Sequence, residues 1–547
     1  MSITMKPIPF PELLRQAMGE YQSKHTLFGV PVAPVPAPST PVELYGSALE
    51  SVIGPAAGPH TQLAQNLAAG YAAGGRYFEL KTVQVLWGEE LGIQRPCIYV
   101  RDEGYNTEWS TELRAEQAAE EYIKGWLLLK LLCREFDLGS PEGFVFNLSV
   151  GYDLPGIQSP SVDRFLNVMK DASVTPFWGQ CIDEALKIPF ERVDEAYIRG
   201  ISPNISNNIT LSTMHGCPPE QIEAIAAYLM EEKGLHTSIK CNPTLIGREA
   251  ARRLLDEQGY EDIHFDPAQF DHDMKREDAI PMLRRLMEKG KQLGLRFGVK
   301  LTNTFPVKIE HGELAGETMY LSGKALFPLS LATARLLTEE LEGELPISFS
   351  GGADEHCAGA LFGAGIYPIT VATVLLKRGG YKNLSKLVGV CALEKPVLVR
   401  VDGEKLAVLE KNALEYSEHF RRKEPKKALG QVPPFACGRC TTCMDVCPNR
   451  ANYLVPGLKQ KGIHLDGPCN DCGACACACP FGFRPYADKF VLFPDEATLR
   501  ESDRDGFVLT GDGCLVRYQK ALVQDLSALP DEVKELMEAV RAMELAQ

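Results

Sequence analysis

Eight of the 17 cysteines in this sequence of 547 residues fall into two short runs with the same spacing. The first run has the pattern C-x2-C-x2-C-x3-C-P and comprises Cys437, Cys440, Cys443 and Cys447. The second run repeats this pattern with Cys469, Cys472, Cys475 and Cys479. A thiolate at every third residue of a tight loop can bind three corners of a cubane, so the doubled run predicts two [4Fe–4S] clusters and single-electron transfer.

The fourth cysteine of each run is expected to bind the cluster of the other run, as in two-cluster bacterial ferredoxins. One cluster would then be held by Cys437, Cys440, Cys443 and Cys479, which we name the first quartet. The other would be held by the second quartet, Cys469, Cys472, Cys475 and Cys447. Two alternatives compete with this interpretation, a zinc ribbon and, in an oxidising compartment, a disulfide framework. Cys477 is surplus and is expected to pack beside a cluster.

Composition favours a soluble protein of the reducing cytoplasm. The content of 45% hydrophobic and 24% charged residues is ordinary for a globular chain. A net charge of −15 makes nucleic acid and anionic membranes poor partners. We expect no signal peptide and no membrane span, because no apolar stretch is long enough. The cysteines outside the two runs fit a compartment that keeps thiols reduced.

The electrons need an acceptor elsewhere in the chain, and an alternating pattern of strands and helices over residues 46–382 predicts a (β/α)8 barrel. The predicted strands are 49–56, 77–83, 143–150, 208–214, 237–241, 295–301, 346–350 and 369–373. Helices are predicted at 111–133, 218–233, 279–293 and 328–341. A doubly wound sheet would need a G-x-G-x-x-G turn, which the sequence lacks.

Four further parts are expected around the barrel. Residues 1–45 form a proline-rich N-terminal arm, and residues 383–434 form a small β extension and linker. In that extension, Asp402-Gly403 is typical of a hairpin turn between two short strands within 396–409. Residues 435–490 form the ferredoxin-like module, and residues 491–547 form a C-terminal extension with an amphipathic helix at 531–545.

Polar side chains follow several predicted strands, at the end of the barrel where active sites of this fold form. They include Lys81, Asn147, Lys240, Asn242, Thr302, Asn303 and Thr304. Burying an unpaired ammonium is costly, so each lysine either lines a site or forms a structural salt bridge. Gly351-Gly352 and Ala372-Thr373 follow the last two strands, where barrels hold a flavin phosphate. Two ordinary tight turns are the alternative.

Taken in order, these motifs resemble the FMN barrel of class 1 dihydroorotate dehydrogenases and of dihydropyrimidine dehydrogenase. The series comprises Lys81-Thr82, Asn147 to Ser149, Lys240 to Thr244, Thr302 to Thr304, Ser322 to Pro328 and Gly351-Gly352. The phrase from Thr213 to Pro219, and the barrel as a whole, is most similar to the YgfK-like family, which often carries the label of a selenate reductase subunit. The resemblance covers residues 45–490.

The resemblance implies roles for these residues. FMN would be bound by Lys81, Asn147, Lys240, Thr302, Gly351, Gly352, Ala372 and Thr373. A planar heterocyclic substrate would be bound by Asn147, Asn242, Asn303 and Thr304. Cys217 would protonate the substrate, with His215 as the second candidate acid. A helix beginning at residue 218 is expected to lower the pKa of the Cys217 thiol.

The resemblance therefore implies an oxidoreductase in which two [4Fe–4S] clusters feed FMN, and FMN reduces a C=C or C=N bond of a purine- or pyrimidine-like heterocycle. Urate is the first candidate, since YgfK-like proteins are associated with anaerobic purine breakdown. The missing dinucleotide motif predicts an electron donor outside this chain, either an NAD(P)H- and FAD-binding subunit or a soluble ferredoxin; self-association stays open. The alternative is an electron-transfer subunit, as in a selenate reductase, without a substrate site.

Overall fold

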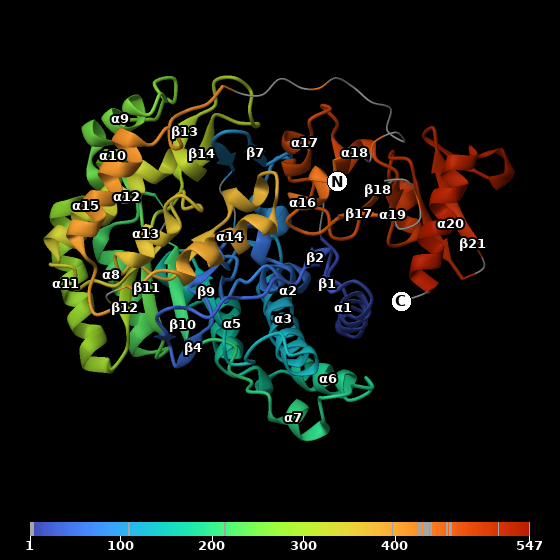
Figure 1. The fold of residues 1–547 in the computed structure, drawn as a ribbon, viewed down its shortest axis with the longest axis horizontal. Helices are drawn as coiled ribbons and strands as arrows, with labels where there is room; N and C mark the ends of the chain where they lie inside the picture. Colours follow the sequence, from blue (N-terminus) through green and yellow to red (C-terminus); the bar gives the residue numbers. More distant parts are fainter. Residues whose placement is uncertain are drawn as a thin grey trace.

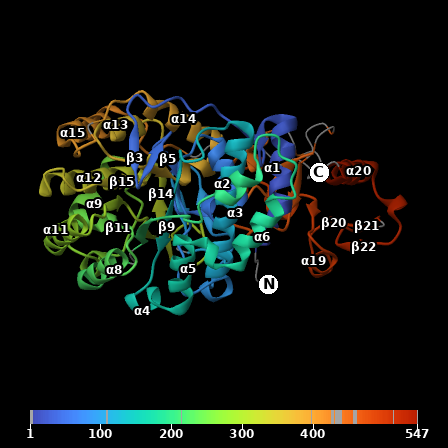
Figure 2. The ribbon, with the colours of Figure 1, turned by 90° about the horizontal axis from the view of Figure 1, so that it is seen from below.

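The computed structural model describes residues 5–545 except 108–109, 213–214, 397, 425–428, 430–436, 438–439, 456–457, 459–461 and 512. Figure 1 shows a large barrel in blue, green and yellow beside a smaller C-terminal unit in red. Helix α1 (Phe10–Lys24) lies between these two parts in both views (Figures 1 and 2). Within the described part of the chain, no helix is long and apolar enough to cross a membrane.

Eight parallel strands build the barrel, and all eight were predicted. They are β5 (Ile53–Pro55), β6 (Tyr77–Glu79), β9 (Val145–Val150), β10 (Asn208–Ser212), β11 (His236–Cys241), β12 (Phe297–Leu301), β15 (Ile347–Phe349) and β16 (Ile369–Val371). They pair in the order β5-β16-β15-β12-β11-β10-β9-β6. The Arg76 amide donates to the Ile53 carbonyl at 2.8 Å and brings β6 back to β5. A Cβ at Gly54 would lie 1.5 Å from the Tyr77 carbonyl oxygen, so this closure needs glycine.

Helices follow the strands and cover the outside of the barrel (Figure 1). They are α2 (Ala64–Ala72), α3 (Ala115–Phe136), α5 (Pro160–Lys170), α8 (Pro219–Glu231), α11 (Arg276–Leu293), α12 (Phe327–Glu340), α13 (Ala358–Gly363) and α14 (Tyr381–Ala392). The four helices named from the sequence are among them, with ends that differ by at most four residues. Strand β9 is buried along its whole length, because helices cover one face and the barrel interior the other.

A small antiparallel sheet, β13-β14-β8-β7, was not predicted. Its strands are β7 (Ile98–Val100), β8 (Gly104–Asn106), β13 (Phe305–Lys308) and β14 (Thr318–Ser322). They come from the loops after β6 and β12, so the sheet lies over the carboxyl ends of the barrel strands. Its edge strand β7 contacts the cysteine module, since the Cys97 and Ile98 amides donate to the Cys472 carbonyl at 3.1 and 2.8 Å.

The hairpin predicted within residues 396–409 is wrong, because this segment contains helix α15 (Gly403–Lys411). The Asp402 carboxylate accepts hydrogen bonds from the Glu404 and Lys405 amides at 3.0 and 3.1 Å. Aspartate before glycine is therefore a helix N-cap here and not a turn between strands. Leu406 and Leu409 are buried and join α15 to the barrel core.

The C-terminal unit contains a sheet in the order β17-β18-β19-β20-β21-β22. The strands are β17 (Asn452–Leu454), β18 (Gly462–Leu465), β19 (Val491–Leu492), β20 (Gly506–Thr510), β21 (Gly513–Tyr518) and β22 (Ala521–Val523). Helix α20 (Asp531–Leu545), which has its predicted bounds, packs Val533, Leu536 and Val540 against this sheet. One sheet thus joins the cysteine runs to the C-terminal extension.

Candidate functional site

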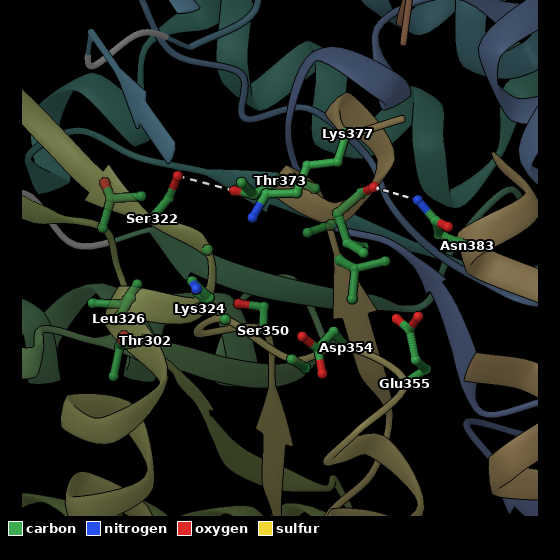
Figure 3. A pocket seen from close by; sticks show the side chains of 18 of the residues that line it. Thr302, Ser322, Lys324, Leu326, Ser350, Asp354, Glu355, Thr373, Lys377 and Asn383 are labelled. Atoms are coloured by element: carbon green, nitrogen blue, oxygen red, sulfur yellow. Dashed lines mark hydrogen bonds between the residues drawn. The ribbon is translucent and has the colours of Figure 1, made fainter. Parts of the chain in front are cut away.

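A cavity of about 310 Å³ opens at the carboxyl ends of the barrel strands (Figure 3). Its volume lies at the lower end of the range for small-molecule sites. The lining comes from the last residues of six strands or the loops after them, β5, β11, β12, β14, β15 and β16, from helix α14, and from the segment after α15. Lining residues predicted from the sequence are Lys240, Thr302, Thr304, Gly352, Ala372 and Thr373.

Small residues keep one side of the cavity open. Gly352 has φ +83°, and a Cβ there would lie 2.3 Å from the Gly323 carbonyl oxygen. A Cβ at Gly323, which has φ +73°, would lie 2.9 Å from Thr373 Cγ2. The Thr373 hydroxyl donates to Ser322 Oγ at 2.9 Å (Figure 3). Side chains at these two positions would collide with the neighbouring loops, so glycine lets the loops pack closely and leaves backbone groups and hydroxyls at the cavity wall, where they can approach an anion.

Lysines make the cavity strongly basic. The β11–β12 register places Lys300 beside Lys240, and both line the cavity. Lys300 forms an ion pair with Glu79 in which each side chain is 2% exposed. Lys324 Nζ lies 2.7 Å from Asp102 Oδ2, and Lys377 donates to the Asp102 carbonyl. Burial lowers the pKa of Lys377, against the opposing effect of Asp102. Such a wall suits a ligand that carries phosphate or a delocalised negative charge.

His419 and Asp354 form an acid–imidazole pair in the same cavity. His419 Nε2 lies 2.5 Å from Asp354 Oδ2, and the His419 ring stacks on His356 at 3.8 Å between centroids. Burial would raise the pKa of Asp354, but the contact with His419 lowers it overall. Sequence reasoning missed His419 because it lies in the predicted linker, far along the chain from any barrel strand.

Several predicted site residues lie outside the cavity lining, namely Lys81, Asn147, Asn242, Asn303 and Gly351. Asn147 is fully buried, donates to Asn208 Oδ1 at 2.7 Å and accepts from the Thr210 hydroxyl at 2.8 Å. The Asn303 amide donates to Asn242 Oδ1 at 2.9 Å. Their ligand-binding roles stay predictions.

His215 is held by a buried carboxylate at the edge of the site. Its Nδ1 lies 2.8 Å from Asp273 Oδ2, and its Nε2 lies 3.3 Å from the carbonyl oxygen of the cavity residue Thr304. The Thr244 hydroxyl and the Gly216 amide also donate to Asp273, each at 2.7 Å. Burial would raise the pKa of Asp273, but these hydrogen bonds lower it overall. The imidazole is thus oriented by a fixed acceptor.

Cys217 is half-buried, and its thiol lies 3.3 Å from Gln221 Oε1. Burial and the negative charge of Asp153 raise the pKa of this thiol. The expectation that the start of α8 lowers it is therefore wrong, because desolvation outweighs the helix terminus. A raised pKa keeps the thiol protonated at neutral pH.

Thiols of the two cysteine runs lie near one another, both within and between the two predicted quartets, and their assignment to two clusters stays a prediction. Burial raises the pKa of Cys437, and the thiols of Cys443, Cys479 and Cys440 raise it further. The thiol of Cys447 lies close enough to contribute to the raised pKa values of Cys469, Cys472 and Cys475. The second quartet also lines one small cavity together with Asn449, Asn452, His464, Asn470 and Tyr486. In the described part of the chain, no three His, Cys, Asp or Glu side chains come together closely enough to hold a metal ion.

Comparison with known proteins identifies relatives for most of the chain. Residues 28–421 match the family model described as "Oxidoreductase YgfK, N-terminal TIM-barrel domain". Two curated relatives, both named "Putative oxidoreductase YgfK", come from Escherichia coli K12 and Escherichia coli O157:H7. Each is 42% identical over 472 residues, which is 82% of this chain and 45% of the relative. The chain thus spans about half the length of these relatives.

Solved structures of DHODH from Eimeria tenella also align with the chain. The ligand-free form gives a TM-score of 0.40 at 14% identity, over 70% of this chain and 92% of that one. The complex with ferulenol gives a TM-score of 0.39 at 14% identity, over 65% of this chain and 82% of that one.

Proposed function

Since this chain belongs to the YgfK oxidoreductase family, we propose that it is an iron–sulfur flavoenzyme that reduces a nitrogen heterocycle. In this proposal, single electrons enter through two [4Fe–4S] clusters and reach FMN in the barrel cavity. A C=C or C=N bond of a purine- or pyrimidine-like ring is then reduced, with urate as the first candidate. The observation that carries the proposal is the basic, glycine-lined cavity at the carboxyl ends of the strands.

The cavity residues fit FMN. Gly352, Ala372 and Thr373 would hold the phosphate, where Gly352 and Gly323 allow the loops around the cavity to pack closely without side chains. Lys240 would lie near the ring system and stabilise negative charge on it, and Lys81 is the second cation proposed for this role. FMN, when bound, would supply the conversion between single electrons and hydride. Residues beyond the predicted set also line this cavity, above all Lys324, Lys377 and His419.

The thiols of the second quartet fit a cluster, since all four line one small cavity beside the barrel. The first quartet fits one through the mutual proximity of its thiols. We expect the electron donor to be an NAD(P)H- and FAD-binding partner or a soluble ferredoxin.

The loop from His215 to Cys217 is proposed to supply the proton that completes reduction of the double bond. Cys217 is the first candidate, because burial keeps its thiol protonated. His215 is the second, because Asp273 orients its ring and Nε2 points to a residue that lines the cavity. Asn242, Asn303, Thr304 and Asn147 are proposed to hydrogen-bond the polar edges of the ring.

Anaerobic purification tests the proposal in two steps. Extraction should give FMN, and analysis should give eight iron and eight sulfide per chain, as two cubanes require. The photoreduced protein is then mixed with urate, xanthine or uracil while flavin absorbance is followed without oxygen. Reoxidation by a purine or a pyrimidine supports the proposal. Full cofactor content without reoxidation by any heterocycle would leave only the electron-transfer role, and zinc in place of iron would contradict both.

A further inference from the structure

The second quartet sits directly against the barrel mouth, through the edge of hairpin β7–β8. The Cys472 carbonyl accepts hydrogen bonds from the Cys97 and Ile98 amides. The next residue, Gly473, has φ +89°, and a Cβ there would lie 2.4 Å from Pro96 Cβ. The loop that carries Cys472 therefore packs on the hairpin with no space between them.

A buried ionic network reinforces this contact. Arg95 Nη1 donates to Cys97 Sγ at 2.6 Å, and Arg95 pairs with Glu112. Glu112 Oε1 accepts from the Asn470 amide at 2.7 Å, so the network reaches the residue between Cys469 and Asp471. Glu112 and Asn470 are 4% and 1% exposed, and Cys97 is fully buried.

The barrel also holds the other loop of the second quartet. Asn66, at the start of α2, donates to the Pro448 carbonyl at 2.8 Å and to Asn449 Oδ1 at 3.1 Å. Pro448 follows Cys447, the fourth thiol of this quartet. Both loops that carry the second quartet are thus anchored to the loops after β5 and β6.

The first quartet has a different neighbour. Lys489, which is 7% exposed and belongs to the cysteine module itself, acts electrostatically on Cys437 and hydrogen-bonds the thiol of Cys443. Each quartet therefore has a neighbouring cation, the partly buried Arg95 from the barrel for the second quartet and the buried Lys489 from the module for the first, and Lys489 also acts electrostatically on Cys475. Arg95 acts electrostatically with Cys97 and Cys472.

We infer that the cluster of the second quartet is the one that passes electrons to the barrel, and that Arg95 raises its reduction potential. Reduction adds one negative charge to a cluster, and a partly buried guanidinium beside it stabilises the reduced form where the local dielectric constant is below that of water. The negative charge of Glu112 lowers the reduction potential of the same cluster, and its ion pair holds Arg95 in place. This inference rests on the clusters of the proposed function, but on no particular substrate.

Potentiometric titration followed by EPR on the full chain tests the inference. Cys440→Ser and Cys475→Ser first assign the two signals to the first and second quartets. In Arg95→Met, the reduction equilibrium constant of the second-quartet cluster should fall by about tenfold or more, a shift of about 59 mV for one electron. Glu112→Gln should shift the same cluster upward, and Lys489→Met should lower the first-quartet cluster more than the second-quartet cluster. Arg114→Met, at an exposed arginine near Glu112 in sequence, should change neither.

Stopped-flow reduction of the flavin by a one-electron viologen donor tests the route. Cys475→Ser, which loses a ligand of the second-quartet cluster, should slow it by at least about tenfold, whereas Arg114→Met should leave it unchanged. If Arg95→Met loses iron, the inference is tested with Arg95→Lys and Glu112→Gln instead. Arg95→Lys keeps the positive charge and should therefore keep the reduction potential of the second-quartet cluster. Unchanged potentials at full iron content, shifts of equal sign in Arg95→Met and Glu112→Gln, or an unchanged flavin rate in Cys475→Ser would overturn the inference. Lack of reoxidation by any heterocycle would overturn the proposed function alone.

Discussion

Replacing Lys300 by methionine would leave Glu79 as a carboxylate without its cation at the base of the barrel cavity. Each side chain of this pair is 2% exposed, so water cannot replace the lost partner. The Ala57 amide also donates to Glu79 Oε2 at 3.2 Å, a neutral donor that does not balance the charge. Removing one member of a buried ion pair costs about 3–5 kcal/mol, and we expect Lys300→Met to destabilise the barrel by that amount.

A double-mutant cycle isolates the pair from the lost lysine side chain. Glu79→Gln removes the charge and keeps an oxygen that can accept from Ala57. The double variant Lys300→Met/Glu79→Gln should recover at least about half of the loss, because no uncompensated charge remains. Lys291→Met is the matched control, since its partner Glu344 lies 3.8 Å away and both side chains are more than 60% exposed. That exposed pair should contribute less than about 1 kcal/mol.

Urea unfolding followed by tryptophan fluorescence measures these differences. All four tryptophans, at positions 87, 109, 126 and 178, precede the cysteine runs by more than 250 residues in the sequence, so their fluorescence reports on the N-terminal part of the chain. A tenfold change in the unfolding equilibrium constant corresponds to about 1.4 kcal/mol. The expected loss of stability therefore raises this constant by more than about a hundredfold. A loss below about 1 kcal/mol in Lys300→Met, or a double variant as unstable as the sum of its singles, would refute the reasoning.

Three other predictions concern the cavity, the proton donor and pH. Gly352→Ala should lose bound flavin, because its Cβ would meet the Gly323 carbonyl. Gly179→Ala is the control and should keep flavin, because there is open space around Gly179. Equal flavin contents in the two variants would contradict the role of Gly352 in flavin binding. Cys217→Ala should be reduced by dithionite normally but turn over about 10²–10⁴ times more slowly, with His215→Asn as the comparison; normal single-turnover rates in Cys217→Ala would remove the thiol from its role. Burial lowers the pKa of His60 to about 3. The unfolded chain binds a proton at this histidine below about pH 6.5 and the folded protein does not, so stability should fall by about 2 kcal/mol between pH 7 and pH 5. Urea unfolding at the two pH values should show this loss disappear in His60→Gln, and an unchanged slope would contradict it.

The alternation of apolar runs with helical patterns along the sequence was enough to predict the barrel. Eight apolar runs separated by helical patterns gave the strands, because strands buried on both faces leave a continuous apolar signal. Lys240, Thr302, Gly352 and Thr373 could be predicted to lie together because the carboxyl ends of parallel strands meet at one face of a barrel.

Two features could not be predicted from the sequence, one because its local pattern is ambiguous and one because it depends on a long-range contact. Asp402-Gly403 has the same composition in a hairpin turn and at a helix start, and only the burial of Leu406 and Leu409 against the barrel decides for α15. The pair of His419 with Asp354 joins positions 65 residues apart in sequence. A pattern in one stretch of chain cannot report such a contact, because it depends on where the segment after α15 folds back.

One acidic residue connects the cavity to the parts outside the barrel. Asp102, between β7 and β8, contacts Lys324 through its carboxylate and Lys377 through its carbonyl, and it accepts from the Lys423 amide at 2.8 Å. The hairpin that holds these cavity lysines also carries Cys97, which contacts the second quartet. Displacing the hairpin would therefore disturb the cavity and the cysteine loop together. If the two sites are coupled in this way, Asp102→Asn should weaken flavin retention and also broaden the EPR signal of the second-quartet cluster, while leaving that of the first quartet unchanged.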